Sequence, residues 1–206
     1  MSIFVRQLRK TQFKLTGRKE MKIFIETERL ILREILPIDE KGLFELDSNP
    51  NVHTYLGKNP VENIDQIREV IKMIRQQYID NGIGRWAIID KQTNDFIGWT
   101  GLKFETETIN NHKKYYDLGY RLIEKYWGKG IATETTKATL KYAFVELNLI
   151  EIYAICDIGN IASKNVLEKT GLKIIETFEL DGIKHHWFRI SKDEWTEIQK
   201  PNAQLR

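Results

Sequence analysis

The stretch of residues 115–133 constrains the fold more than any other part of this chain. It predicts a strand, a glycine-containing loop and the start of a helix, in that order. The strand has one apolar face, because its large side chains alternate at period two. The alternating residues are Tyr116, Leu118, Tyr120 and Leu122. Gly128 and Gly130 lie in the loop, where they permit backbone torsions and close approaches that a side chain would forbid.

From residue 131 the apolar spacing becomes helical, with steps of four, three, four and three residues. The residues of this face are Ile131, Thr135, Ala138, Tyr142 and Val145. A loop of small residues that leads into a helix directs several unpaired N–H groups to one place, with the positive end of the helix dipole behind them. We therefore predict an anion site at this loop, and phosphate is the usual ligand of such a site.

Two common phosphate-binding loops do not match this segment. The Walker pattern needs a glycine, four residues and then Gly-Lys-Ser/Thr, which Gly128-Lys129-Gly130 does not supply. The dinucleotide fingerprint needs three glycines, and Thr133 stands at the third position. An ordinary tight turn between a strand and a helix is the plain structural alternative.

The same segment resembles the pyrophosphate loop of the GCN5-related N-acetyltransferases (GNAT), which bind acetyl-CoA. Residues 126–134, Tyr-Trp-Gly-Lys-Gly-Ile-Ala-Thr-Glu, are similar to the ribosomal-protein N-terminal (RimJ/RimL-like) acetyltransferase branch, as are residues 26–33. The family motif is Arg or Gln, two residues, Gly, one residue, then Gly or Ala. Gly130 and Ala132 fit it, whereas Trp127 stands where Arg or Gln is usual.

A second stretch, residues 160–172, resembles the family's Asn-x-x-Ser/Ala helix that ends in Gly-Phe, with Leu172 in place of Phe. Locally, Asn160 is a good helix N-cap and Gly171 a good stop. The resemblance adds that Asn160 binds the CoA arm. It implies a set of acetyl-CoA-binding residues at both motifs. These are Leu122, Ile123, Trp127, Gly128, Lys129, Gly130, Ile131, Ala132, Thr133, Asn160 and Ser163.

The implied reaction is attack of an amine on a thioester, which needs a proton acceptor, an oxyanion site and help for the leaving thiolate. By analogy with the family, backbone N–H groups near Leu122 and Ile123 stabilise the oxyanion. Many relatives use a tyrosine as the acid, but the aligned position here is Leu167, which carries no proton. Ser163 is the next candidate acid, and the alternative is that it only fills the first helical turn.

Asp117 and Glu105 are candidate general bases that would act through a water. A solvated charge at the end of a strand explains each of them as well. Four aromatic residues are candidates for the acceptor pocket, although core packing also accounts for them. They are Tyr55, Trp86, Trp99 and Phe104. His185 and His186 would point to opposite faces of a strand, so we predict no metal site.

The patterns predict one α/β domain with a central mixed sheet of about seven strands and helices on both faces. The expected strands are 28–34, 85–90, 96–105, 115–122, 150–156, 172–180 and 186–190. The expected helices are 39–47, 63–80, 131–145, 160–170 and one near Trp195. Asp181-Gly182 is a good two-residue turn between the last two strands. The acetyltransferase family has the same order of elements.

Composition separates the chain into two parts. Residues 1–20 hold six basic residues and one acid, and form a basic N-terminal extension that we expect to be flexible. Residues 21–206, the expected GNAT-like domain, hold 26 basic and 28 acidic residues, which argues against a nucleic-acid surface. No apolar run reaches the ~18 residues of a membrane span. A single cysteine, Cys156, suits a reducing compartment, so we expect a cytoplasmic protein.

The resemblance implies an acetyl-CoA-dependent N-acetyltransferase that acts on a protein or peptide N-terminal amine, without a metal. Three alternatives stay open. The acceptor could be a small amine such as a polyamine, an amino acid or an antibiotic. The chain could bind CoA without activity, because Leu167 removes one common acid. It could also be an interaction scaffold unrelated to CoA. The expected partners are acetyl-CoA and an amine, and a homodimer is compatible with the family.

Overall fold

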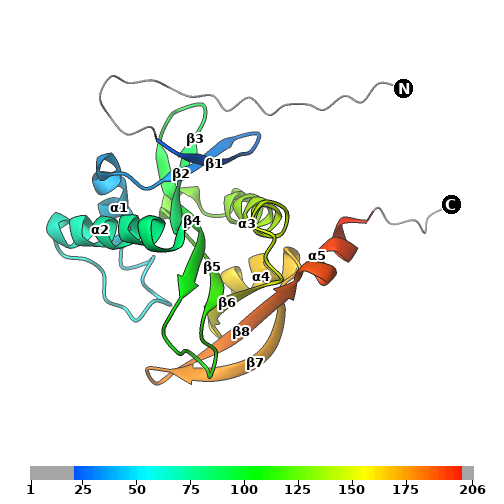
Figure 1. Cartoon of the computed structure of the whole chain (residues 1–206). Coiled ribbons are helices and arrows are strands. Elements are labelled where there is room, and N and C mark those ends of the chain that lie inside the picture. Colours follow the sequence, from blue (N-terminus) through cyan, green and yellow to red (C-terminus); the bar gives the residue numbers. More distant parts are fainter. Residues whose placement is uncertain (1–20, 201–206) are drawn as a thin grey trace, which may run out of the picture.

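An eight-stranded sheet runs through residues 21–200, the part of the chain that the computed structural model describes (Figure 1). The strand order across the sheet is β1-β2-β3-β4-β5-β6-β8-β7. The strands are β1 (Ile23–Glu26), β2 (Leu30–Glu34), β3 (Arg85–Asp90), β4 (Phe96–Glu105), β5 (Tyr115–Leu122), β6 (Glu151–Asp157), β7 (Lys173–Leu180) and β8 (Ile183–Ser191). All neighbours pair antiparallel except β5 and β6, which are parallel.

Helices cover both faces of this sheet, with α1 and α2 on one side and α3 and α4 on the other (Figure 1). The helices are α1 (Glu40–Asp47), α2 (Ile64–Asn81), α3 (Ile131–Lys141), α4 (Ile161–Lys169) and α5 (Lys192–Gln199). Short helical turns are η1 (Pro37–Asp39), η2 (Glu124–Tyr126) and η3 (Tyr142–Glu146). The predicted mixed α/β class and its approximate strand count are confirmed. Within residues 21–200, no helix is both long and apolar enough to cross a membrane.

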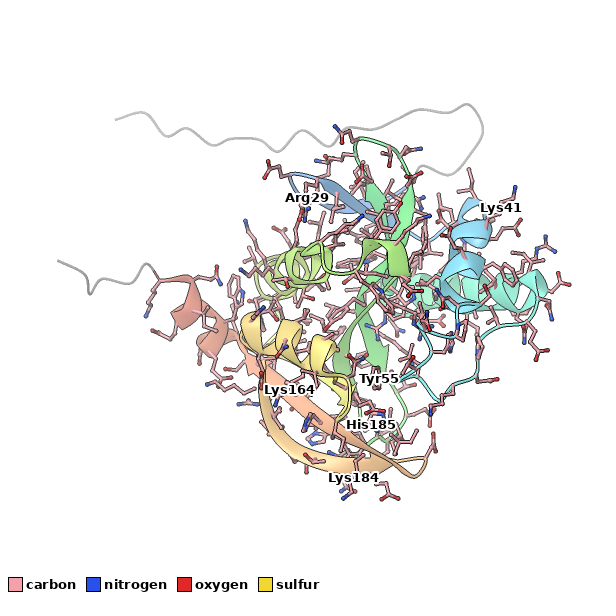
Figure 2. The ribbon with its side chains drawn as sticks, turned by 180° about the vertical axis from the view of Figure 1, so that it is seen from behind. Arg29, Lys41, Tyr55, Lys164, Lys184 and His185 are labelled. Atoms are coloured by element: carbon pink, nitrogen blue, oxygen red, sulfur yellow. The ribbon has the colours of Figure 1, made fainter. Side chains whose placement is uncertain are left out.

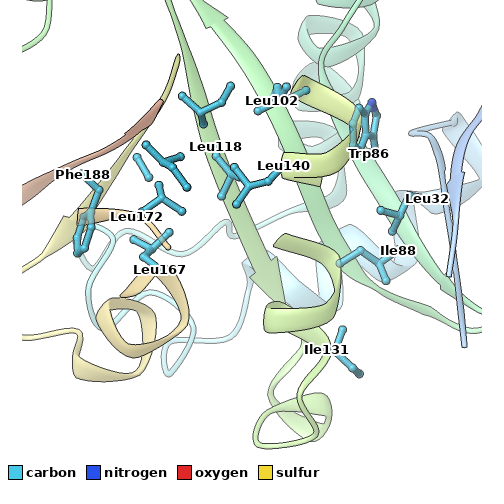
Figure 3. Close-up of a cluster of buried hydrophobic side chains, with 14 of the residues drawn as sticks. Leu32, Trp86, Ile88, Leu102, Leu118, Ile131, Leu140, Leu167, Leu172 and Phe188 are labelled. Carbon is cyan, nitrogen blue, oxygen red and sulfur yellow. The ribbon is translucent and has the colours of Figure 1, made fainter. Parts of the chain in front are cut away.

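Two hydrophobic cores lie on opposite faces of the sheet, because side chains alternate along each strand. On β3, Trp86 and Ile88 join the core under α3 and α4, whereas Ala87 and Ile89 join the core under α1 and α2. Figure 3 shows Trp86 and Leu167 inside the first of these cores. The sheet is therefore buried on both faces where the helices pack on it.

The pair β5 and β6 interrupts the regularity of the sheet. Asp117 and Tyr153 are the one pair of residues that the two parallel strands share, although β5 has eight residues and β6 has seven. Beyond that pair the strands separate toward their carboxyl ends. The loop before α3 follows the carboxyl end of β5, and the start of α4 follows that of β6. Both predicted CoA-binding motifs therefore lie at the end where the two strands separate.

Most local signals in the sequence are confirmed. Asn63 caps α2 through hydrogen bonds from two backbone N–H groups, and Gly82 ends that helix with φ +70°. Asp181 and Gly182 both have positive φ, as a tight two-residue hairpin turn requires. Ser191 begins α5 with the predicted capping box.

Three sequence predictions differ from the structure. β1 was not predicted, because it is a four-residue edge strand. Val145 was predicted on the buried face of the central helix but is 54% exposed, because the wider π-helical turn η3 shifts the register there. Trp86 was predicted to line an acceptor pocket, and this is wrong: its side chain is fully buried in the core. The predicted extension, residues 1–20, lies outside the described residues.

The burial of Trp86 gives a prediction about stability. Phe24 stacks on its ring at 4.9 Å, and Tyr142 meets it edge-on at 5.3 Å. Trp86→Ala should therefore lower the free energy of unfolding by about 3–5 kcal/mol, as measured by chemical denaturation. Ile79→Ala, at a residue 71% exposed, is the control and should change it by less than ~0.5 kcal/mol. Similar values for both variants would contradict a core position.

Candidate active site

The loop before α3 presents a run of backbone N–H groups with no acceptor. Within residues 21–200, no protein group accepts a hydrogen bond from the amides of residues 128–133. The first amide of this region that is bonded belongs to Glu134, which donates to the Gly130 carbonyl at 3.0 Å. Six free N–H groups at a helix N-terminus form an anion site, because the helix dipole adds to their partial charges. The predicted arrangement of free amides is thus present, and the anion that they bind stays a prediction.

The conformation of this loop depends on its two glycines and on a tryptophan. Gly128 and Gly130 have φ of +72° and +75°, which is costly for a residue with a Cβ. A Cβ at Gly130 would meet no atom within 4 Å, so the requirement is for the torsion angle and not for space. The Trp127 indole donates to the Leu122 carbonyl at 2.8 Å and ties the loop to the end of β5.

Arg29 holds the other side of the loop. Its guanidinium donates to Glu134 at 2.5 Å and to the Lys129 carbonyl at 3.3 Å. Glu134 lies in the first turn of α3, where its charge would repel an anion. Because Arg29 neutralises this charge, the free amides keep a net attraction for phosphate. No local pattern marks Arg29 as part of this site, because Glu134 is 105 positions away in the sequence.

At the carboxyl end of β5 the backbone faces the separation between β5 and β6. The Ile123 amide donates to the Ile97 carbonyl at 2.9 Å, so it is not available to an oxyanion. In an antiparallel pair, bonding to one neighbour alternates along the strand. The Leu122 amide therefore points away from β4 and toward β6. Of the two amides predicted to bind the oxyanion, only that of Leu122 stays a candidate.

The start of α4 lies across this separation. Asn160 accepts a hydrogen bond from the Ser163 amide at 3.0 Å, which confirms its role as an N-cap. The Ser163 hydroxyl lies 3.0 Å from the Tyr120 hydroxyl of β5. Burial raises the pKa of Tyr120 well above its ordinary value, so the phenol stays protonated. Leu167, one turn along α4, is 1% exposed and belongs to the core.

Both predicted bases are paired with cations. Arg85 forms a salt bridge with Asp117, and both side chains are nearly buried. Burial raises the pKa of Asp117, and the Arg85 guanidinium opposes that shift. Glu105 pairs with Lys103 at 2.7 Å. Asp117 lies where β5 and β6 still pair, and Glu105 lies farther from the separated ends.

A cavity of about 440 Å³ lies between the α1–α2 loop, the end of β6 and the β7–β8 hairpin. Tyr55, Asp157 and Ile183 are among its lining residues. Figure 2 shows Tyr55 on the same side of the molecule as Lys184 and His185, with Arg29 at the opposite end. Tyr55 was predicted as an acceptor-pocket residue, whereas Asp157 was not, because nothing in its local pattern marks it.

The other two predicted aromatic residues lie elsewhere. Trp99 lies on the α1–α2 face, with the guanidinium groups of Arg85 and Arg121 each 5.3 Å from its ring. Phe104 is half-buried against Tyr116, with ring centroids 5.0 Å apart. The structure therefore does not bring the four aromatic residues into one pocket.

A buried polar cluster near β5 was not predicted. Asp47 pairs with Arg121 at 2.5 Å, and His53 Nε2 lies 4.0 Å from the same carboxylate. Burial and the Arg121 charge lower the pKa of His53, so its imidazole is neutral at pH 7. Asp47 and Arg121 are 74 positions apart in the sequence and meet only in the fold, so no local motif marks this cluster.

Comparison with known proteins agrees with this geometry. The acetyltransferase (GNAT) domain family matches residues 29–173. The uncharacterized N-acetyltransferase YoaA of Bacillus subtilis is 31% identical over 149 residues, which are 72% of this chain and 82% of YoaA. The putative ribosomal N-acetyltransferase YdaF of the same organism is 27% identical over 180 residues, 82% of this chain and 94% of YdaF.

A solved structure shares the fold. Spermidine N-acetyltransferase from Vibrio cholerae, in complex with CoA and spermine, has a TM-score of 0.67 and 23% identity, and the match covers 82% of this chain and 99% of that one. The match of the family to most of the chain shows that this protein belongs to the GNAT acetyltransferases. It is an acetyl-CoA-dependent N-acetyltransferase, and thus an acyltransferase.

The Arg85–Asp117 pair gives a prediction about stability. Asp117→Asn leaves the nearly buried Arg85 charge without its partner, so the free energy of unfolding should fall by about 3 kcal/mol. Asp65→Asn is the matched control, because its salt bridge with Arg68 is exposed and should be worth less than ~1 kcal/mol. Chemical denaturation measures both. An unchanged stability of Asp117→Asn would show that the ion pair does not support the fold.

Proposed function

We propose that this enzyme transfers the acetyl group of acetyl-CoA to the α-amine of a protein or peptide N-terminus. The free amides of residues 128–133 carry the donor half of the proposal, because they can bind the pyrophosphate of CoA. From there the CoA arm extends along β5 into the separation between β5 and β6. Its thioester then lies between the backbone of β5 and the start of α4.

The roles of single residues follow from this arrangement. The Leu122 amide stabilises the oxyanion, because it is the amide at the end of β5 that points toward β6. Ser163 serves the departing thiolate from the first turn of α4. Asn160 uses its oxygen for the helix cap, which leaves its NH₂ group for the CoA arm. Asp117 and Glu105 stay candidate bases, and each forms a salt bridge with a basic residue.

The state of the two carboxylates supports an α-amine as the acceptor. An α-amine has a pKa of about 8, against about 10.4 for a lysine. A larger fraction of it is unprotonated at pH 7, so it needs less help from a strong base. Asp117 and Glu105 each form a salt bridge, so neither is an unpaired carboxylate that could serve as the base for a lysine. The resemblance to the ribosomal branch and to YdaF points to the same class of acceptor.

Gly130→Asp tests the donor site. The substitution forces a Cβ into φ +75° and puts a negative charge beside the pyrophosphate, so acetyl-CoA affinity in calorimetry should fall at least about tenfold (~1.4 kcal/mol). Gly82→Asp is the matched control: its φ is +70°, it also has open space around it, and it lies at the end of α2. Unchanged affinity of Gly130→Asp would refute the site.

A small amine is the second candidate acceptor, and the cavity of about 440 Å³ favours it. Its volume lies in the range of ligand pockets. Tyr55 offers an aromatic face and Asp157 a carboxylate to a cationic amine, and Lys58 lines the same cavity with the opposite charge. An acceptor panel that includes peptides, amino acids and polyamines, assayed by thiol release, distinguishes the two candidates.

Asp157→Asn tests the second candidate. The Asp157 carboxylate accepts a hydrogen bond from the Gly159 amide at 2.7 Å, and an asparagine oxygen can keep this bond. The variant should raise KM for a polyamine about fivefold, because a charge pair of ~1 kcal/mol is lost, and leave acetyl-CoA affinity unchanged. An equal KM for polyamines in both proteins would remove the cavity as their binding site.

A further inference from the structure

Tyr120 links β5 to α4 across the separation between β5 and β6. Its hydroxyl lies 3.1 Å from the Ser163 carbonyl oxygen and 3.0 Å from Ser163 Oγ. Tyr120 and Ser163 are 43 positions apart in the sequence. The strands β5 and β6 share just the pair Asp117–Tyr153, which precedes both residues. The contact thus lies where the two strands have already diverged, at the side chain proposed to serve the leaving thiolate.

The helix does not need this contact for its own stability. The Ser163 amide is already bonded to the Asn160 cap, and serine in the first turn of a helix needs no further partner. Tyr120 packs against the core through its ring, and this packing needs no hydroxyl. A phenol placed so that its one proton can reach a serine hydroxyl has a directional effect, because it decides where the proton of that serine points.

Two arrangements of the protons give a hydrogen bond between the two hydroxyl groups. In one, Tyr120 donates to the Ser163 carbonyl, and Ser163 Oγ donates to the phenol oxygen. In the other, Tyr120 donates to Ser163 Oγ, and the Ser163 proton points away from the phenol, toward Cys156 Sγ or into the separation between β5 and β6. Burial keeps Tyr120 protonated, so the phenol remains a donor in both. A thiolate in the separation between β5 and β6 favours the second arrangement, because a hydrogen bond to a charged acceptor is the stronger one.

We propose that Tyr120 is a positioning residue, whose hydroxyl donates to Ser163 Oγ and thereby directs the Ser163 proton at the sulfur of CoA. The inference rests on the proposed function, which puts the thioester beside Ser163. When the amine nitrogen bonds to the thioester carbon and the C–S bond breaks, the electron pair stays on sulfur. Ser163 donates a hydrogen bond to this thiolate. The proton that the amine nitrogen loses finally converts it to the thiol, so Tyr120 and Ser163 keep theirs.

The test compares the binding of CoA and acetyl-CoA as the pH rises, by calorimetry on the full chain. A donor aimed at sulfur favours the thiolate, so CoA should bind more tightly as the pH passes the pKa of a thiol, near ~8.5. Acetyl-CoA has no thiol and is the internal reference. Cys156, Asp157 and Lys164 lie around Tyr120 and Ser163. A change in their charge with pH affects the binding of both ligands equally, so it cancels in the ratio of the two affinities.

In the wild type, the preference for CoA over acetyl-CoA should grow about tenfold between about pH 7 and about pH 9.5. In Tyr120→Phe it should grow less than about threefold, with acetyl-CoA affinity at pH 7 unchanged. Tyr142→Phe is the matched control: this tyrosine packs on the same core, its hydroxyl has no bonded partner within residues 21–200, and the variant should keep the wild-type pH dependence.

A double variant separates positioning from a general loss of structure. Ser163→Ala should remove the pH dependence by itself, and Tyr120→Phe in that background should change nothing further. A wild-type pH dependence in Tyr120→Phe, or a further loss in the double variant, would overturn the inference and leave the proposed function intact. If the wild type bound neither CoA nor acetyl-CoA, the proposed function would fail as well, and the two failures are therefore distinguishable.

Discussion

The structure depends on the incomplete pairing of two parallel strands. β5 and β6 meet at Asp117 and Tyr153 and then diverge, so the facing edges of both strands carry backbone groups without strand partners. Backbone N–H and C=O groups need partners when they leave water. A ligand with its own amide groups, such as the arm of CoA, can supply them. The divergence therefore leaves backbone groups of both strands open to hydrogen bonds from a ligand of this kind.

The remaining parts of the site lie around this separation on both faces of the sheet. On the α3–α4 face lie the free amides of residues 128–133 and the contact between Tyr120 and Ser163. On the α1–α2 face lie the Arg85–Asp117 pair and the cluster around Arg121. The proposed donor groups are thus separated by the sheet from the candidate proton acceptors. An acceptor amine and a departing thiolate could therefore act on opposite sides of the thioester.

Sequence patterns predicted what is decided locally. The glycine loop, the Asn160 cap and the Asp181-Gly182 turn each depend on neighbouring residues, and all three are present. Patterns failed where distant packing decides. Trp86 has the same alternating context whether it faces a pocket or a core, and Val145 moves because of one wide turn. The Tyr120–Ser163 contact and the Asp157 cavity join segments from different parts of the chain, so no local pattern could reveal them.

The central claim is that the amides of residues 128–133 bind the diphosphate of CoA. Titration of the isotopically labelled protein with CoA, followed by amide NMR, tests it most directly. The account predicts that the proton resonances of these amides move downfield together and more than those elsewhere, because each gains a charged acceptor. Saturation with CoA that leaves these resonances in place, while others shift, would contradict the account.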